Sequence, residues 1–299
     1  MTLVDCNNGD TVTDAAAAAN DGDTLNITGT CNEANITVDK NLTFTGNGTI
    51  NAQQQDRVLT NDGADLTLTG SLTLTGGQAF GNFPTDRGGG IYNNGGTVTL
   101  TGDATITGNE ARFGGGIYNL DGGTVGLIGN ATISNNEATN AGGGIDNFGT
   151  VTLKGDATIT GNRDVSFGGG ISNRSGGTVT LNGGTISSNE AVDGGGIYNG
   201  SGGKVTLTGG SITGNEAKFG GGGIFNGGRV TLDGDATITD NTAKGVPDGF
   251  TATFNGGGIY NAGTVSGKFN GVTVPGDTGQ KGEVLDASFG NSPDDIYFN

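Results

Sequence analysis

The segment Gly88–Phe113 reads GGGIYNNGGTVTLTGDATITGNEARF, and it is the unit from which most of the chain is built. Its opening block, Gly-Gly-Gly-Ile-x-Asn, recurs with steps of 26, 28, 26, 26, 27 and 35 residues between the isoleucines Ile91, Ile117, Ile145, Ile171, Ile197, Ile224 and Ile259. A second motif, Ile-x-x-Asn, recurs between these blocks with its isoleucines at Ile106, Ile133, Ile159, Ile186, Ile212 and Ile238. A fixed period between about 20 and 50 residues is typical of proteins built from stacked repeats.

Alternating residues within the unit predict short β-strands. Three segments are rich in β-forming residues, around Ile91, at Thr97–Thr101 and at Ala104–Thr107, and Gly, Asn and Asp separate them as turns require. In the second segment Val98 and Leu100 share one face and the threonines share the other. Three strands joined by turns make one coil of a three-sided prism, and the next coil stacks in parallel about 4.8 Å away. The sequence therefore predicts an all-β, right-handed parallel β-helix of about ten coils.

Stacking predicts columns of equivalent side chains. Inside the prism we expect a valine column and a leucine column, Val98, Val125, Val151, Val179, Val205 and Val230 beside Leu100, Leu127, Leu153, Leu181, Leu207 and Leu232. The block asparagines should line a corner and bond to the coils above and below, at Asn93, Asn119, Asn147, Asn173, Asn199, Asn226 and Asn261. The Gly triplets would permit close approach between coils.

The chain reads as a single domain over residues 1–299 with four sections. Residues 1–23 form an N-terminal cap with a short helix over Val12–Asn20, which Asp10 or Thr11 could cap. Irregular coils follow over 24–87, regular repeats of about 26 residues over 88–262, and a C-terminal cap over 263–299. Atypical end sections are expected, since the outermost coils of an array have one uncovered face.

Composition excludes several classes of function. The chain has 30 Asp plus Glu against 13 Lys plus Arg, a net charge of −17, which disfavours nucleic acid and anionic lipid as partners. The surface charge serves solubility or tolerance of high salt, or else it binds Ca²⁺; no other cofactor is expected. No His is present, and no apolar run is long enough for membrane insertion. A disulfide between Cys6 and Cys31 would close the N-terminal loop and suit an oxidising compartment.

The repeats resemble a known family. Ile-Thr-Gly-Asn-Glu-Ala at 106–111 and 212–217, alternating with Gly-Gly-Gly-Ile-Tyr-Asn at 88–93 and 114–119, is similar to the repeats of chlamydial polymorphic outer-membrane proteins. In those repeats Ala stands at the third Gly position and Phe at the Ile position of the second motif. With its cysteine-containing opening, Ala-rich helix and Gly-Asp-Thr-Leu at 22–25, the chain also resembles secreted pectate-lyase-like β-helix proteins. This resemblance implies the fold, which hosts lyases, hydrolases, adhesins and ice binders alike.

Aromatic residues are the candidate ligand-binding residues. The residue after each block isoleucine should point out of the prism, and at five coils it is aromatic: Tyr92, Tyr118, Tyr198, Phe225 and Tyr260. Stacked rings could receive sugar rings or a partner surface; alternatively, they pack along their own column and shield the Gly-rich backbone. Two insertions before Gly triplets, at 78–87 and 242–255, add Phe83 and Phe250, and they either form a contact site or cover core near the ends.

Outward hydroxyl groups offer a second surface. One column comprises Thr105, Thr132, Thr158, Thr185, Ser211 and Thr237, and the other Thr107, Ser134, Thr160, Ser187, Thr213 and Thr239. Such an array resembles an ice-binding face, whereas β-propensity alone also explains threonine on a solvated strand.

These observations favour a non-catalytic secreted or cell-surface protein, adhesin-like or structural, with an extracellular glycan or cell-surface partner. A polysaccharide lyase or glycoside hydrolase of the β-helix superfamily is the first alternative, and an ice-binding protein is the second. No catalytic residue is assigned, because the acids Asp103, Asp156 and Asp235 occupy a turn position that Asn or Gly fills in other coils. The sequence leaves the oligomeric state open.

Overall fold

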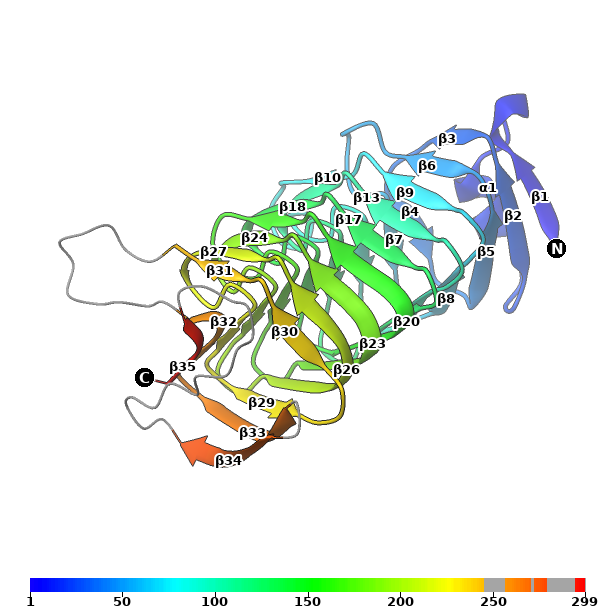
Figure 1. Cartoon of the computed structure of the whole chain (residues 1–299). Helices are drawn as coiled ribbons and strands as arrows, with labels where there is room; N and C mark the ends of the chain where they lie inside the picture. Colours follow the sequence, from blue (N-terminus) through cyan, green and yellow to red (C-terminus); the bar gives the residue numbers. More distant parts are fainter. Residues whose placement is uncertain (245–255, 270–271, 279–293, 299) are drawn as a thin grey trace.

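The computed structural model is a rod of stacked parallel strands with about nine turns (Figure 1). It describes all residues except 245–255, 270–271, 279–293 and 299. The described strands form three sheets, referred to here as sheets A, B and C, of 18, 10 and 7 strands. The predicted all-β parallel solenoid is therefore confirmed.

The largest sheet contains two strand segments from most coils. Sheet A comprises β1 (Thr2–Asp5), β2 (Thr24–Thr28), β3 (Thr30–Asn32), β5 (Leu42–Gly46), β6 (Thr49–Asn51), β8 (Asp65–Leu68), β9 (Thr73–Thr75), β12 (Thr97–Leu100), β13 (Thr105–Thr107), β16 (Thr124–Ile128), β17 (Thr132–Ser134), β20 (Thr150–Thr160), β23 (Thr178–Ser187), β26 (Lys204–Thr213), β29 (Arg229–Leu232), β30 (Thr237–Thr239), β33 (Thr264–Phe269) and β34 (Val272–Thr278). The second and third segments predicted from the sequence thus belong to one sheet, and in β20, β23 and β26 they form one continuous strand.

The other two sheets take at most one strand from each coil, and sheet C begins only at β10. Sheet B comprises β4 (Ile36–Val38), β7 (Leu59–Asn61), β11 (Ile91–Asn93), β15 (Ile117–Asn119), β19 (Ile145–Asn147), β22 (Ile171–Asn173), β25 (Ile197–Asn199), β28 (Ile224–Asn226), β32 (Gly256–Asn261) and β35 (Asp294–Phe298). Sheet C comprises β10 (Gln78–Ala79), β14 (Glu110–Phe113), β18 (Glu137–Ala141), β21 (Arg163–Asp164), β24 (Glu190–Asp193), β27 (Glu216–Gly220) and β31 (Thr242–Ala243). Sheet C is not predicted from the sequence, because its Glu-Ala segments show no long β-type alternation.

The interior contains the predicted apolar columns. The valines and leucines pair in register from coil to coil, as Val98 with Val125 and Leu100 with Leu127, and both columns are buried. The two isoleucine series are buried in the same core. Each buried aliphatic side chain contributes about 1.5–3 kcal/mol, so the stack holds together through many equal contributions.

Two asparagine ladders run through the buried corners. In the first, each Nδ2 donates to the Oδ1 of the next coil at 2.7–2.8 Å, from Asn61 through Asn93 to Asn261. The second ladder runs from Asn109 to Asn241 with corresponding distances of 2.9–3.0 Å. All these amides donate towards the C-terminal coil. Asn61 begins the first ladder opposite Val38, and its Oδ1 is buried without a hydrogen-bond partner.

The Gly triplets let sheet C turn back against sheet B. Gly114 has φ of +65°, and a Cβ there would lie 2.3 Å from the carbonyl oxygen of Ile117. A Cβ on Gly115 would lie 2.4 Å from the carbonyl oxygen of Glu137. Any larger residue would therefore force the strands of sheet C away from the stack.

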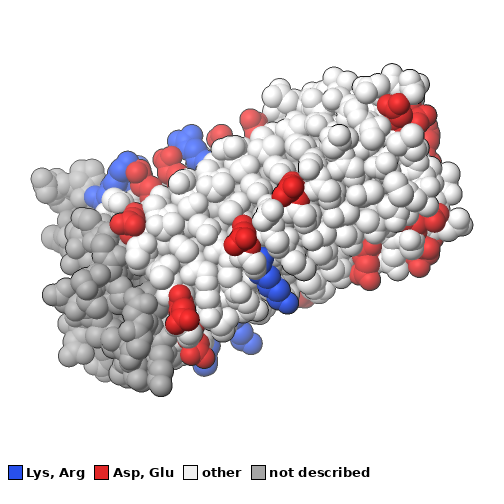
Figure 2. Space-filling view, turned by 45° about the vertical axis from the view of Figure 1, so that its right-hand side comes forward, with Lys and Arg blue, Asp and Glu red and all other residues white. Residues whose placement is uncertain are grey.

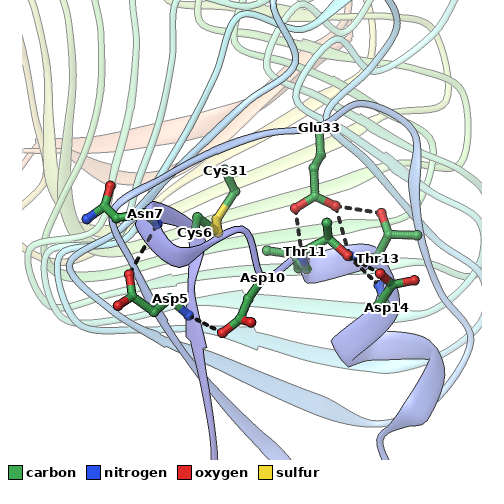
Figure 3. The surroundings of a disulfide bond; sticks show 10 residues. Asp5, Cys6, Asn7, Asp10, Thr11, Thr13, Asp14, Cys31 and Glu33 are labelled. Carbon is green, nitrogen blue, oxygen red and sulfur yellow. Dashed lines mark hydrogen bonds between the residues drawn. A yellow bond between two sulfur atoms is a disulfide. The ribbon is translucent and has the colours of Figure 1, made fainter.

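The N-terminal cap is tied to the first coils by charge and by a disulfide (Figure 3). The 3-10 helix η1 (Cys6–Asn8) carries the predicted bond to Cys31, and the α-helix α1 (Val12–Ala18) has Thr11 as its N-cap. The Glu33 carboxylate accepts the N–H groups of Val12 and Thr13, and Lys40 donates to the carbonyls of Ala16, Ala17 and Ala19. Both charges complement the helix dipole.

At the other end, β33 continues sheet A by pairing in parallel with β29, and β34 pairs with β33 in antiparallel orientation. In the described part of the chain, no helix has the length and apolar character needed to cross a membrane.

Candidate binding surface

The aromatic column lies on the outer face of sheet B, but it is covered. Tyr92, Tyr118 and Tyr260 are buried, whereas Tyr198 and Phe225 are half-buried. Successive rings stack, with centroids 5.7 Å apart for Tyr92 and Tyr118 and 5.1 Å apart for Tyr198 and Phe225. The structure thus places these rings in their own column, and their burial argues against the role of an open sugar receptor.

A second apolar layer explains this burial. The ends of the sheet C strands form a ladder in which Arg87 pairs with Phe113, and Ala141 pairs with Phe167. From this ladder Phe167 contacts Tyr198, with ring centroids 4.8 Å apart. The buried alanines of sheet C, such as Ala111 and Ala138, also lie outside the main core cluster. We call this region between sheets B and C the outer layer.

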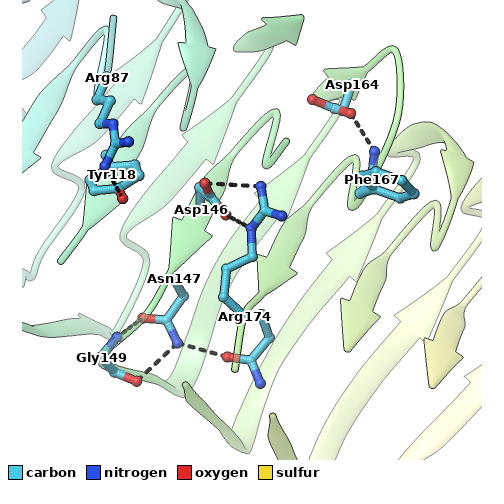
Figure 4. A network of polar contacts seen from close by, with 9 residues as sticks. Arg87, Tyr118, Asp146, Asn147, Gly149, Asp164, Phe167 and Arg174 are labelled. Atoms are coloured by element: carbon cyan, nitrogen blue, oxygen red, sulfur yellow. Dashed lines mark hydrogen bonds and ion pairs between the residues drawn. The ribbon is translucent and has the colours of Figure 1, made fainter. Parts of the chain in front are cut away.

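Two adjacent coils replace apolar residues of the outer layer by polar ones (Figure 4). In the aromatic column, Asp146 and Ser172 pair in register and stand where tyrosines stand elsewhere. Asp146 is fully buried and accepts from Arg174 Nε at 2.7 Å and Nη2 at 3.3 Å. Burial raises the pKa of Asp146, and the Arg174 guanidinium opposes that rise.

Asp164 makes the same kind of replacement in sheet C. It occupies the position of Ala138 in the preceding coil and is 3% exposed. One carboxylate oxygen accepts the N–H groups of Ser166 and Phe167, and the other oxygen is buried without a partner. Burial raises the pKa of Asp164 to about 7. The sequence signal was present, since Asn162-Arg163-Asp164 replaces the recurrent Asn-Glu-Ala, but the sequence reading assigned it no role.

The insertion at 78–87 is held in place by two arginines. Arg57 is buried and donates to the carbonyl oxygen of Pro84 at 2.7 Å. Arg87 lies over the rings of Phe83 and Tyr118, 4.4 and 4.7 Å from their centroids, and donates to the Tyr118 hydroxyl. Through these contacts the outer layer anchors the insertion.

The anchored insertion exposes two rings. Phe83 is 67% exposed and Phe80 is 47% exposed. Among the aromatic residues predicted to bind a ligand, Phe83 is therefore the one that is mostly exposed to solvent. Phe250 lies outside the described residues. Phe80, which lies in the same insertion, is not predicted as a binding residue from the sequence.

An open hollow of about 350 Å³ lies beside Phe80. It is lined by Gln55, Asp56, Gln78, Phe80, Gly81 and Thr85. Sheet C begins at β10, so the hollow forms where the preceding coil has a turn instead of a sheet C strand. The N–H of Gln78 donates to the carbonyl oxygen of Asp56 and joins the turn to the strand.

The hydroxyl columns lie on sheet A and are longer than predicted. The first extends in register from Thr30 through Thr49 and Thr73 to Thr237. Some neighbours bond to each other, as Thr132 with Thr158 at 3.1 Å. The face in Figure 2 has broad uncharged areas between scattered acidic and basic side chains.

Potential metal ligands gather at one place in the described ranges, where Cys6, Cys31 and Glu33 lie close together. Both sulfurs are used by the disulfide, and the Glu33 carboxylate binds the start of α1. These atoms therefore serve the cap, and Ca²⁺ binding by the acidic surface stays a prediction.

Comparison with known proteins yields no family model, no curated protein and no solved structure that matches this chain.

Proposed function

We propose that this chain is a non-catalytic extracellular binding protein, adhesin-like in character, whose rigid rod presents the insertion at 78–87 to a glycan or cell-surface partner. The observation that carries the proposal is the solvent exposure of Phe80 and Phe83 on an anchored loop. The disulfide suits an oxidising exterior.

The anchoring distinguishes this loop from a simple cover over the core. An insertion that only shields apolar surface would bury its rings, since burying a phenyl group contributes about 2–3 kcal/mol. Here Arg57 and Arg87 hold the loop, while Phe83 keeps two thirds of its surface in water. Rigid exposed aromatic rings are typical of contact sites, because little conformational entropy is lost when they bind.

The polysaccharide lyase or hydrolase alternative has weaker support. Such enzymes need carboxylates that reach the glycosidic bond or its neighbouring proton. Burial raises the pKa of three carboxyl groups in the outer layer. Asp146 and Asp164 are 0% and 3% exposed, so a substrate cannot contact them in this structure. Asp193 is partly exposed, but its Oδ1 already accepts the N–H of Gly220.

The test is attachment of the full chain to cell surfaces and immobilised extracellular glycans. The double variant Phe80→Ala/Phe83→Ala should attach at least tenfold more weakly. A matched control, Ile128→Ala/Val165→Ala, removes two exposed apolar side chains elsewhere and should attach like the unaltered chain. Attachment to no surface would contradict the proposal. Reducing-end or unsaturated products from acidic or neutral glycans, with or without Ca²⁺, would replace it with the enzyme.

Ice binding is a second candidate because the first hydroxyl column runs unbroken from Thr30 to Thr237. Its hydroxyls repeat about every 4.8 Å between coils, and the second column lies about 6.5–7 Å away along each strand. A flat uncharged array of this kind could order water. Thermal hysteresis and ice-crystal shaping that Thr158→Lys abolishes would support this candidate, and the absence of both effects would remove it.

A further inference from the structure

We propose that the hollow beside Phe80 is a subsite for a neutral sugar residue that carries adjacent free hydroxyl groups. This inference rests on the binding function proposed above, and it adds the location of the site and the class of its ligand. Its volume of about 350 Å³ is near the lower end of the roughly 300–1,000 Å³ typical of small-molecule sites. The hollow therefore suits one or two sugar rings of a longer glycan.

The polar groups of the hollow have capacity left for a ligand. Asp56 Oδ1 accepts its neighbour's backbone N–H at 2.7 Å, whereas Oδ2 accepts no hydrogen bond from the described residues. The side-chain amide of Gln55 likewise makes no hydrogen bond within the described chain and is exposed. Gln78 donates its Nε2 to Glu110 at 3.3 Å, and its side-chain Oε1 accepts no hydrogen bond from the described residues. Planar carboxylate and amide groups of this kind can bond two adjacent hydroxyls at once.

Phe80 supplies the apolar side of the subsite. Its ring lines the hollow and is 47% exposed. One face of a pyranose ring carries mainly C–H groups, and burying them against an aromatic ring gains hydrophobic free energy without desolvating the hydroxyls. Phe83 does not line the hollow, but it is exposed on the same insertion and would be the residue to contact a neighbouring ring of the glycan.

Charge selects a neutral sugar over a uronate. The acidic groups at the hollow are Asp56, which lines it, and Glu110, which accepts from Gln78. The guanidinium of the adjacent Arg57 is buried, lies 3.8 Å from Asp56 Oδ1 as its ion-pair partner, and donates to the Pro84 carbonyl oxygen, so it is not free for a ligand. A uronate carboxylate would therefore meet negative charge without an available cation, and a neutral sugar would meet acceptors for its hydroxyl protons.

Titration calorimetry of the full chain tests the inference with a panel of neutral oligosaccharides, made of glucose, mannose, galactose or N-acetylglucosamine, and with polygalacturonate as the charged probe. At least one neutral oligosaccharide should bind, and polygalacturonate should bind at least tenfold more weakly. Asp56→Asn and Phe80→Ala should each weaken neutral binding at least tenfold, while Asp121→Asn, at an exposed turn of another coil, should not change it. Asp56→Asn retains the Oδ1 acceptor of the Arg57 N–H but loses the 3.8 Å ion pair with the buried Arg57 guanidinium, so its thermal midpoint should fall slightly while the chain still folds.

The opposite results overturn the inference. They are tighter binding of polygalacturonate, unchanged neutral binding in both hollow variants, or binding of no member of the panel. If the panel fails while the chain still attaches to cell surfaces through Phe80 and Phe83, the sugar subsite is wrong and the binding function stands. If the chain attaches to no surface and binds no sugar, both proposals are wrong.

Discussion

The inner core and the outer layer follow the same coil spacing, but they differ in how strictly they repeat. Inside the regular repeats, the same residue types recur in each column, as in Val98 with Val125, and the irregular coils substitute other apolar residues, as Leu66 opposite Val98. In the outer layer, the column that contains Tyr118 continues with Asp146 and then Ser172. The difference shows what stacking demands. A core position pairs with apolar residues of the coils on both sides. At a position in the outer layer the residue type can change from apolar to charged when a neighbour such as Arg174 compensates the charge.

The largest expected effect comes from breaking an inner ladder. Asn162→Ala removes the acceptor for the N–H and Nδ2 of Asn136 and the donor to the Ile133 carbonyl. Each buried polar group left unpaired costs about 1–3 kcal/mol, so we expect a loss of about 5 kcal/mol in the free energy of unfolding. Chemical denaturation measures it, with the exposed Asn182→Ala as control at about 0.5 kcal/mol. Equal effects of the two variants would show that the ladder is not a stabilising element.

A smaller loss of stability should follow when the charge of Asp146 in the outer layer is no longer compensated by Arg174. Arg174→Met leaves the Asp146 carboxylate buried without its partner, which costs about 3–5 kcal/mol. Asp146→Tyr/Arg174→Phe instead copies the pair one coil earlier, Tyr118 and Phe148, whose ring centroids lie 5.6 Å apart, and should recover most of that stability. If the double variant is as unstable as the single one, the outer layer does not tolerate exchange between coils.

The raised pKa of Asp164 should make the stability of the chain depend on pH. Its folded pKa is raised from 3.8 to about 7, so the folded state holds a proton that the unfolded state has released. Stability is therefore undiminished below about pH 4, falls as the pH rises to about 7, and stays low above that. Asp164→Asn keeps the acceptor for Ser166 and Phe167 but cannot ionise, so above pH 7 it should be more stable by up to about 4 kcal/mol.

Denaturation midpoints of Asp164→Asn and the unaltered chain between pH 4 and 8 make that measurement. The two curves should meet near pH 4 and diverge by pH 7. Parallel curves would mean that Asp164 does not ionise in this range.

The smallest effect on stability is expected at the surface of the insertion. Phe83 is mostly exposed and contributes mainly its contact with Arg87, worth about 0.5–1 kcal/mol. Phe83→Ala should therefore lower the thermal midpoint only slightly while weakening attachment to surfaces. A large loss of stability would instead identify the ring as a cover for the outer layer.

Features that depend on local pattern could be predicted from the sequence. The strand alternation around Val98, the asparagine corners, the Cys6–Cys31 bond and the helix near Val12 all follow from spacing and residue type. Features that depend on a distant segment could not. The burial of Tyr118 requires sheet C to fold over sheet B, and the hollow at Asp56 exists because sheet C begins one coil later.

The uniform direction of the asparagine ladders has a consequence for the length of the molecule. Each ladder amide accepts from the coil before it and donates to the coil after it, so the asparagine contacts between regular coils are chemically the same. Deleting or duplicating one whole period that leaves the Asp146–Arg174 pair intact, such as Ile186–Ser211, would bring matching asparagine donors and acceptors together again. Gene duplication or protein engineering can therefore shorten or extend such a rod in whole-coil increments while both specialised ends are kept.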